Sequence, residues 1–477
     1  MMKKILLSLV LLCCIGVART QPRAKVSECF ELTGVVFRLS GEKVFVQSTP
    51  ENYVADMDAY FSIYKDHELI RFIRKALDAR HDLDLSMIAD LAADMDITSK
   101  GIVFTRRWIT LYESEDYGKR EEEWSKAELK EYLRLLNKFY KDTRFHRFYE
   151  AHLDFYAEAE KKLQPWVDKI DTAWFSDFFG QPFAVENIWV VPAFGSHNFA
   201  VSRKDRQGKE HFNSVVCYPK LEDGYFAYLN WRVFMTLLHE ICHNYNNPVC
   251  EAYAEVFAPI CDTLYAISYE GLREIYCGKE DLLYESMNRL CEYTYCKSLP
   301  DFPKEELKRR IVSEEMNGFF WLEELLQYME VFYLNRDRFP TYRDFMPQIK
   351  LFMDNVVANL ENYYLPKLQK LQLLRPQVVG TYPMNGSVVD TTLDKLIIVF
   401  SLPIQDGMIW LPDVSSDDIK FSSKEMYWAD ERTYVIPLSQ HLKPHSRYSI
   451  RMPSFFRPVA KEYYYRAQPF EFTFETR

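Results

Sequence analysis

Two histidines four residues apart are the first feature of this sequence whose types and spacing could do chemistry. His239 and His243 lie in the stretch FMTLLHEICHNYNNPVCEAYAE, and Glu240 directly follows the first of them. On a helix these histidines project from one face, about one turn apart, so both imidazoles can bind one tetrahedral zinc ion. Glu240, about 100° around the helix, can accept the proton of a metal-bound water whose pKa zinc lowers to about 7. The H-E-x-x-H pattern predicts a zinc site with a glutamate base.

A third protein ligand is needed if the fourth position is to stay open to water. Pro248 is expected to end the helix, because proline lacks a backbone donor and restrains the residue before it, and a new helix is expected just after it. We predict Glu251 as the third ligand, since it follows the turn that could bring the chain back over the metal. Glu255, one turn further on the same face, is predicted to orient a ligand imidazole. Spacing leaves the swapped assignment of these two glutamates open.

The stretch also offers candidates for stabilising an oxyanion, and it has an ordinary interpretation. Tyr245, Tyr253 and His197 are candidate oxyanion stabilisers by type and neighbourhood. In the ordinary interpretation the segment is a core helix with satisfied histidines, which requires two histidines, the adjoining glutamate and a later acidic residue to coincide by chance. Cys242 is predicted to face away from the metal as a small core residue. The sequence contains no G-x-S-x-G motif, so it does not predict the nucleophilic serine of a serine hydrolase.

The elements that must position these residues differ along the chain. Residues 175–228 alternate β-branched and aromatic residues with turn residues, which indicates a few strands, whereas most of 27–370 has helical periodicity. A β segment followed by a helix with H-E-x-x-H is typical of zinc peptidases, in which an edge strand can bind a peptide by strand addition. We therefore predict a mainly helical α+β, zincin-like catalytic domain at 27–370.

The last hundred residues have a different pattern. From Pro376 the chain shows short β runs separated by turns rich in Pro, Gly, Asn, Ser and Asp. Strands at this spacing predict an all-β, immunoglobulin-like sandwich at 376–477. The predicted strands are Leu396–Phe400, Thr433–Leu438, Tyr448–Arg451 and Phe470–Phe474.

Composition sets the class of protein. The 477 residues are enough for two or three domains, and the hydrophobic content of 48% is enough for globular cores. There are 59 basic and 69 acidic side chains, a formal net charge of −10, which argues against a nucleic-acid surface.

The N-terminus and the cysteines indicate the compartment. Residues 1–18 have the charge-then-apolar form of a secretory signal peptide, with cleavage after Ala18 or Thr20. We expect an exported protein that is periplasmic, secreted or at the cell surface, without a transmembrane segment. Eight cysteines would remain, and Cys291 and Cys296 are close enough in sequence to pair as a disulfide.

With these residues in hand, the chain resembles a known family. The stretch LLHEICHNYNNPVCEAYAE is similar to the H-E-x-x-H, Asn-Pro, Glu run of a family of exported bacterial proteins of unknown function that are classed as zinc metallopeptidases. The segments FFGQPFAVENIWVVPAFGSHNFAV and RFPTYRDFMPQI are similar to later parts of that family, so the resemblance covers about residues 30–360. It implies His239, His243 and Glu251 as ligands and Glu240 as base.

The C-terminal part has a resemblance of its own. The pieces VVGTYPMNGSVVD, LIIVFSLPIQDG and ERTYVIPLSQHLKPHSRYSIRM resemble a bacterial immunoglobulin-like module. Such modules usually act as spacers or binding attachments, which implies possible contact with a surface or a glycan.

The predicted function is that of an exported zinc-dependent metallopeptidase acting on a peptide or protein substrate. The alternative is a surface binding protein with an inactive zincin fold that engages a glycan or protein. The intact Glu240 weighs against it, because a binding protein needs no base beside the metal. Zinc-dependent hydrolysis of a non-peptide amide or ester is a third possibility.

Overall fold

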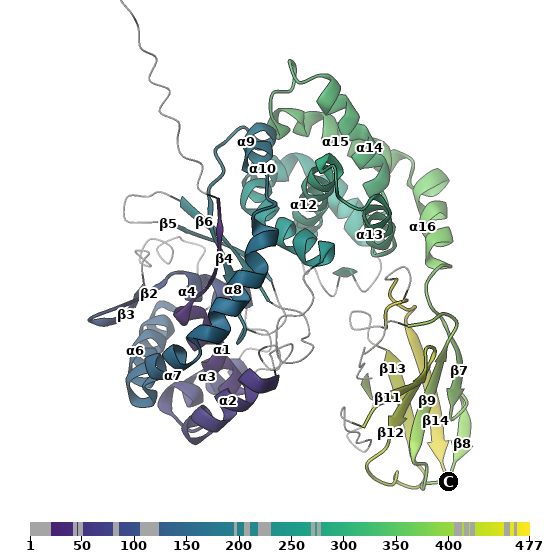
Figure 1. The fold of residues 1–477 in the computed structure, drawn as a ribbon. Helices are drawn as coiled ribbons and strands as arrows, with labels where there is room; N and C mark the ends of the chain where they lie inside the picture. The colour runs from purple at the N-terminus through teal and green to yellow at the C-terminus, as the bar shows by residue number, and fades with distance from the viewer. Residues whose placement is uncertain are drawn as a thin grey trace, which may run out of the picture. The chain divides into compact units, whose positions relative to one another are not determined.

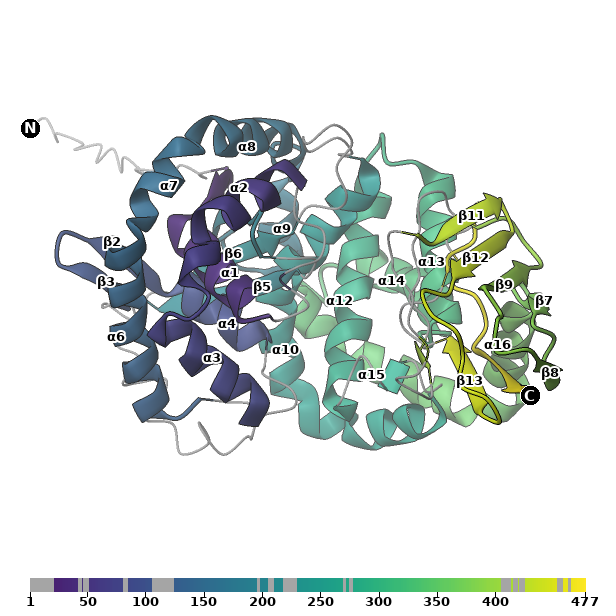
Figure 2. The ribbon, with the colours of Figure 1, turned by 90° about the horizontal axis from the view of Figure 1, so that it is seen from below.

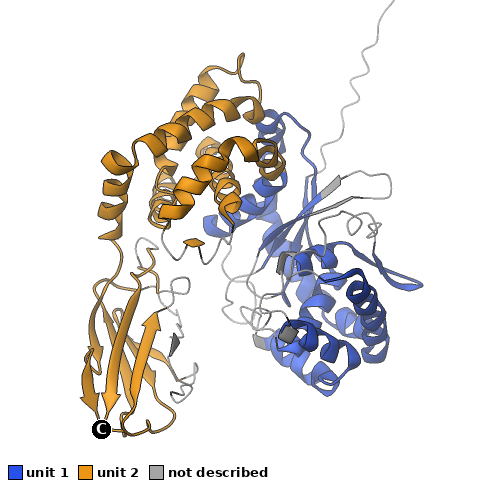
Figure 3. Cartoon of the chain, turned by 180° about the vertical axis from the view of Figure 1, so that it is seen from behind, with its two compact units in different colours: residues 1–244 blue, residues 245–477 orange. Residues whose placement is uncertain are grey.

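The computed structural model describes residues 21–41, 45, 51–79, 85–104, 124–194, 198–204, 210–217, 230–268, 272–273, 278–404, 413–414, 419, 425–452, 458–461 and 465–477. The predicted signal peptide lies outside these ranges. The chain divides into two compact units, Met1–Asn244 and Tyr245–Arg477 (Figure 3). The described residues are rich in helix and also form β-sheets (Figure 1). The predicted domain bounds stay predictions.

The first unit contains a four-stranded sheet. Its order is β1 (Arg23–Val26), β4 (Val185–Val190), β6 (Glu210–Val216) and β5 (Phe199–Lys204). The first three strands run parallel, and β5 runs antiparallel to β6 at the edge. Three of these strands fall inside 175–228, so the prediction of a few strands there is confirmed. Among the described strands, β5 is the antiparallel edge of this mixed sheet, and its outer side pairs with none of them.

Beside this sheet, the described residues of the first unit form helices, a hairpin and the start of α10, the helix described below. A nearly fully buried helix, α1, lies among them and contacts α3, α4 and α7 (Figure 2). A helix that is buried on all sides belongs to a core. The elements are α1 (Glu28–Ser40), α2 (Glu51–Phe61), η2 (Ser62–Tyr64), α3 (Glu68–Ala79), α4 (Leu85–Ala93), β2 (Met95–Thr98), β3 (Gly101–Phe104), α6 (Lys126–Thr143), α7 (Phe145–Ala151), α8 (Leu153–Val167) and α9 (Thr172–Phe179).

A glycine lets α1 approach the segment that follows β4. A Cβ atom on Gly34 would lie 2.4 Å from the carbonyl oxygen of Ala193, far inside normal contact. One turn earlier on α1, Glu31 is fully buried and accepts hydrogen bonds from the Ala193 amide at 3.2 Å and the Tyr53 hydroxyl at 2.6 Å. Burial raises the pKa of Glu31 to about 8 despite these hydrogen bonds. α1 thereby holds the chain just before edge strand β5.

The long helix α10 (Trp231–Ile267) corrects a prediction. It runs without interruption through Pro248 and Pro259, so the expected helix end at Pro248 is wrong. A proline inside a helix costs about 3 kcal/mol. The flanking residues Tyr245, Asn246 and Cys250 are fully buried, and this packing offsets the loss.

The second unit continues from α10 into a group of helices and a β-sandwich. α12 packs against α13 and α14, and α14 packs against α15; the ribbon views show α12 and α14 side by side (Figures 1 and 2). The helices are α12 (Lys279–Ser298), α13 (Lys304–Met316), α14 (Leu322–Leu334), α15 (Tyr342–Ala358), η3 (Leu360–Tyr364) and α16 (Leu365–Gln372).

The C-terminal strands form two sheets around one core. One sheet has the order β10-β13-β14-β8 and the other β11-β12-β9-β7. Side chains of both sheets, among them Ile398, Tyr434, Ile450 and Phe472, share a buried cluster. The strands are β7 (Val378–Tyr382), β8 (Ser387–Val389), β9 (Lys395–Phe400), β10 (Asp413–Val414), β11 (Tyr427–Asp430), β12 (Thr433–Pro437), β13 (Arg447–Met452) and β14 (Phe470–Thr476).

This part confirms the predicted β structure. Each of the four predicted strands corresponds to one of β9, β12, β13 and β14, within about one or two residues at each end. An immunoglobulin-like topology stays a prediction.

Two further observations bear on the sequence predictions. Cys291 and Cys296 are free and buried on α12, so the suggested disulfide between them is wrong. They are five residues apart on one helix, which places the two thiols on different faces. Among the described residues, no helix is both long enough and apolar enough to cross a membrane.

Candidate metal centre

The helix that carries the two histidines is fixed at its start and along one face. Asn230 precedes α10, and its side-chain oxygen accepts hydrogen bonds from the amides of Arg232 and Val233 at 2.9 and 3.3 Å, as a helix N-cap does. Leu237, Leu238 and Ile241 are fully buried. This apolar face anchors the helix in the core and leaves the face with the histidines partly accessible.

The two imidazoles are arranged as a pair. The Nε2 atoms of His239 and His243 lie 3.1 Å apart, and the rings are nearly perpendicular with centroids 4.7 Å apart. Two nitrogen ligands at 2.0–2.1 Å from one tetrahedral zinc ion lie about 3.3–3.4 Å apart. The imidazole pair therefore fits two adjacent positions of a metal site.

A carboxylate that could serve as the third ligand lies close to the two histidines. His239, His243 and Glu285 each offer one ligand atom, and these atoms all lie within 4.8 Å of one another. The three side chains could hold a metal ion. Glu285 is on α12, the next described helix after α10.

The side chain of Asn246 explains how α12 is held against α10. Asn246 is fully buried, and its amide donates to the Tyr284 carbonyl at 3.1 Å. Its oxygen accepts from the Tyr342 hydroxyl at 3.2 Å. Tyr284 directly precedes Glu285, so this hydrogen bond fixes the backbone at the position of the carboxylate. Asn246 lies in the buried part of α10 that follows the histidines, and it connects this part to α12.

An arginine holds the Glu285 carboxylate. The Arg289 guanidinium donates to Glu285 Oε2 at 2.5 Å and to the Glu285 carbonyl at 3.1 Å. It also donates to Glu314 at 2.9 Å and lies 4.3 Å from the centre of the Phe319 ring. A carboxylate has two oxygens, so this pairing is compatible with a ligand role for Glu285.

The predicted third ligand, Glu251, is not part of this group, and the prediction is corrected. Because α10 does not break at Pro248, Glu251 lies eight residues along the same helix from His243, about 12 Å along its axis. Its side chain is exposed. Glu255 is exposed too and borders a separate cavity that Lys279 and Tyr284 also line. The chain does not turn back over the histidines, so neither glutamate reaches them.

Glu240, the predicted base, directly follows His239 on α10. It is only 7% exposed, and its carbonyl accepts from the Asn244 side chain at 3.1 Å. The same Asn244 amide lies 3.4 Å from the carbonyl of Asn213 on β6. These contacts fix the histidine-bearing turn of α10 against the strand beside edge strand β5.

Two of the three candidate oxyanion stabilisers, Tyr245 and Tyr253, receive no support from their positions. Tyr245 is fully buried and lies about 200° around the helix from His243. Tyr253 donates its hydroxyl to the carbonyl of Arg343 at 3.2 Å, ten residues along the helix from His243. His197 lies outside the described residues. Cys242 is fully buried, so its predicted place in the core is confirmed.

Sequence reasoning missed Glu285, and little in the sequence marks it. It follows His243 by 42 positions, in a stretch with no histidine or repeated spacing. The one indication is a run of polar residues, Ser286, Asn288, Arg289 and Glu292, that are buried on α12. Buried polar residues in a helix interior need partners, so such a run can indicate a site.

The fold and this cluster define a helix-rich protein with mixed sheets and a candidate metal centre. The chain belongs to the family described as "Domain of unknown function (DUF4932)", whose model matches residues 25–351. That range includes all three residues of the cluster. The family description assigns no activity. No curated protein matches the chain.

Solved structures give no further guidance. An L,D-transpeptidase, LdtMt1 in complex with imipenem, is 19% identical over 21% of this chain and 39% of that one, with a TM-score of 0.16. The L,D-transpeptidase from Mycobacterium smegmatis has the same coverage and TM-score at 14% identity. The N-terminal part of the bacterial S-layer protein SbsC is 11% identical over 51% of this chain and 58% of that one, with a TM-score of 0.17. The chain thus spans 39% to 58% of the length of these proteins, and the TM-scores are too low to indicate a shared fold.

Proposed function

We propose that this protein is an exported zinc-dependent metallopeptidase with a zincin-like catalytic part. The observation that carries the proposal is the grouping of His239, His243 and Glu285, with Glu240 next to the first histidine. Two imidazoles and one carboxylate are a donor set that zinc takes in catalytic sites, where the fourth position is left for water or substrate. The residues present therefore fit the metal.

The chain's own residues would divide the chemistry as follows. His239, His243 and Glu285 would hold the metal, and Arg289 would orient the Glu285 carboxylate. A bound zinc ion supplies a Lewis acid that polarises the scissile carbonyl and lowers the pKa of water. Glu240 would accept a proton from the attacking water and return it to the leaving amine. Its near-complete burial keeps the carboxylate away from bulk water, which strengthens its interactions in the site.

The sheet of the first unit supports a peptide as the substrate. β5 pairs with β6 on one side only among the described strands. An extended peptide can add to such an edge through backbone hydrogen bonds, which are independent of the peptide's side chains. Asn244 connects the histidine-bearing helix to β6, the neighbour of that edge. If β5 binds a peptide in this way, the substrate is a peptide and not a small amide or ester.

The test is the metal content of the purified full chain, measured by elemental mass spectrometry. We expect about one zinc per wild-type chain. Glu285→Gln should lose zinc on dialysis, because a neutral amide is a poor zinc ligand. Glu251→Gln is the matched control and should keep the metal. Loss of zinc from the control but not from Glu285→Gln would restore Glu251 as the ligand.

The wild-type result decides the proposal itself. A chain that retains no zinc after the metal is supplied and the excess is dialysed away would contradict the peptidase. That outcome would favour the rival function, an inactive zincin-fold binding protein that engages a glycan or protein. Attention would then move to the β-sandwich.

A further inference from the structure

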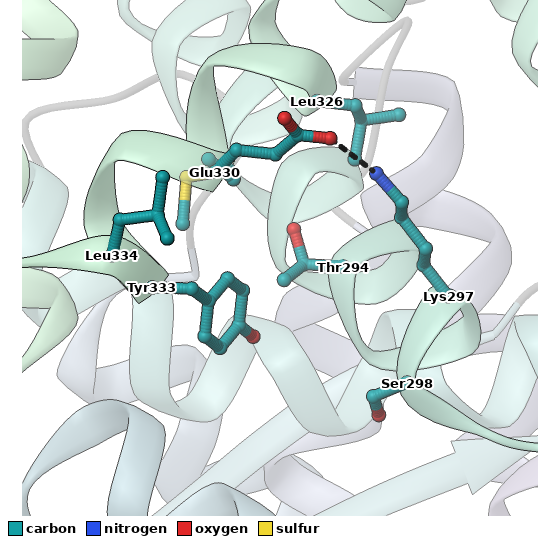
Figure 4. Close-up of a pocket in the computed structure, with 8 residues that line it drawn as sticks. Thr294, Lys297, Ser298, Leu326, Glu330, Tyr333 and Leu334 are labelled. Carbon is teal, nitrogen blue, oxygen red and sulfur yellow. Dashed lines mark ion pairs between the residues drawn. The ribbon is translucent and has the colours of Figure 1, made fainter.

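A cavity in the second unit lies away from the candidate metal centre. It lies between α12 and α14 and has a volume of about 350 Å³ (Figure 4). Lys297, one of its lining residues, is twelve positions beyond Glu285 on α12, about 18 Å along the helix axis. The two places are therefore separate sites on one helix.

The floor and walls of the cavity are apolar. Leu326 and Met329 of α14 are buried there, and Tyr333 and Leu334 are exposed at its side although both are large apolar residues. A volume of this size is at the small end of the range for ligand pockets, about 300–1,000 Å³. The space suits one apolar side chain with a small polar group attached.

The Thr294 hydroxyl is buried in the cavity and has no hydrogen-bond partner in the described part of the chain. Thr294 is only 4% exposed, and its Oγ1 makes no hydrogen bond with any described residue. A helical threonine ordinarily bonds the carbonyl three or four residues back. Leaving such a group unsatisfied costs about 1–3 kcal/mol. Figure 4 shows this side chain between Lys297 and Tyr333, where a bound molecule could supply the missing hydrogen bond.

Opposite charges stand at the mouth. Lys297 of α12 and Glu330 of α14 approach to 3.8 Å, the dashed contact in Figure 4, and their side chains are 56% and 71% exposed. Such an exposed pair contributes about 0–1 kcal/mol, so exchanging partners is nearly without cost. Together the pair offers a cation for a carboxylate and an anion for an ammonium group.

We propose that this cavity binds an apolar α-amino acid as a zwitterion. The side chain lies against Leu326 and Met329, the carboxylate pairs with Lys297, and the ammonium group pairs with Glu330. The Thr294 hydroxyl donates to the ligand carboxylate. The cavity thus offers an apolar wall for the ligand side chain, a cation and a hydroxyl for its carboxylate, and an anion for its ammonium group. The proposal does not depend on metal binding or peptidase activity.

The test is calorimetric titration of the full chain with L-phenylalanine. For a ligand of this size we expect a Kd of about 0.1–1 mM. N-acetyl-L-phenylalaninamide, which lacks both charges, should bind at least tenfold more weakly. His239→Ala should bind L-phenylalanine like the wild type, which separates this site from the candidate metal centre.

Two variants locate the binding. Leu326→Trp fills the cavity and should abolish detectable binding, with circular dichroism as the check on folding. Lys297→Gln changes an exposed side chain, so it preserves the fold, and should weaken binding about threefold to tenfold. No binding by the wild type at several times the expected Kd would overturn the proposal. Equal binding of the uncharged analogue, or wild-type binding by Lys297→Gln, would also overturn it.

Discussion

At the scale of single residues, a substitution of Glu240 can separate peptide hydrolysis from metal binding. Glu240→Gln keeps the size of the side chain but cannot accept a proton. We expect a loss of peptide hydrolysis of about 10²–10⁴-fold, with zinc content unchanged. Screening a peptide library with both forms would measure the loss. Hydrolysis by the variant at the wild-type rate would contradict the role of Glu240 as base.

Glu31 gives a second residue-scale prediction, for stability against pH. Burial raises the pKa of its carboxyl from 4.5 to about 8. Between those two pH values the unfolded chain loses the Glu31 proton and the folded chain keeps it. The folded state then binds more protons, so the free energy of unfolding falls as pH rises from about 4.5 to 8, by up to a few kcal/mol.

The variant Glu31→Gln mimics the protonated carboxyl and should remove this slope. Urea unfolding should show it more stable than the wild type at pH 8 and similar to it at pH 5. Glu361→Gln, on an exposed helical position, is the control and should follow the wild type. If Glu31→Gln keeps the wild-type slope, the carboxyl is not the group responsible.

At the scale of elements, α12 brings its carboxylate to α10 through a small set of polar contacts. Arg289 is held by Glu314 and by the Phe319 ring, and it in turn holds Glu285. Lysine in this place keeps the charge but cannot donate to both carboxylates in the same planar geometry. Arg289→Lys should therefore weaken zinc binding by about 10–100-fold, as changes beside metal ligands do.

Competition with a chromophoric chelator would measure that affinity. Arg338→Lys is a suitable control, because Arg338 stacks on Phe339 away from the Glu285 pair. Equal zinc affinity in Arg289→Lys and the wild type would show that Arg289 does not orient the ligand.

At the scale of the whole molecule, a bound metal should couple folding to zinc concentration. The three proposed ligands, His239, His243 and Glu285, come from α10 and α12, and the unfolded chain does not hold them together. Free zinc at 100 times its Kd stabilises a folded protein by about 2.7 kcal/mol. Removing the metal with a chelator should lower the melting temperature by about 5–10 °C.

Differential scanning calorimetry with and without chelator would measure this shift. The double variant His239→Ala/His243→Ala should show no response to the chelator. A shift of equal size in that variant would place the stabilising metal elsewhere in the chain.

Local patterns in the sequence determined much of this protein. The spacing of His239, Glu240 and His243 placed them on one helix, since helical geometry acts over four residues. Alternation and turn residues identified the strands near 185–216 and in the last hundred residues, because a strand with one buried face repeats every two residues. These predictions rested on interactions between near neighbours along the chain.

Tertiary structure alone decided the third member of the cluster. Burial of Tyr245, Asn246 and Cys250 carries α10 through Pro248, which moves Glu251 away from the histidines. A hydrogen bond from Asn246 to Tyr284 then brings Glu285 in from α12. The energy of burying those residues exceeds the local preference of proline, and no spacing along the chain records which distant helix packs there.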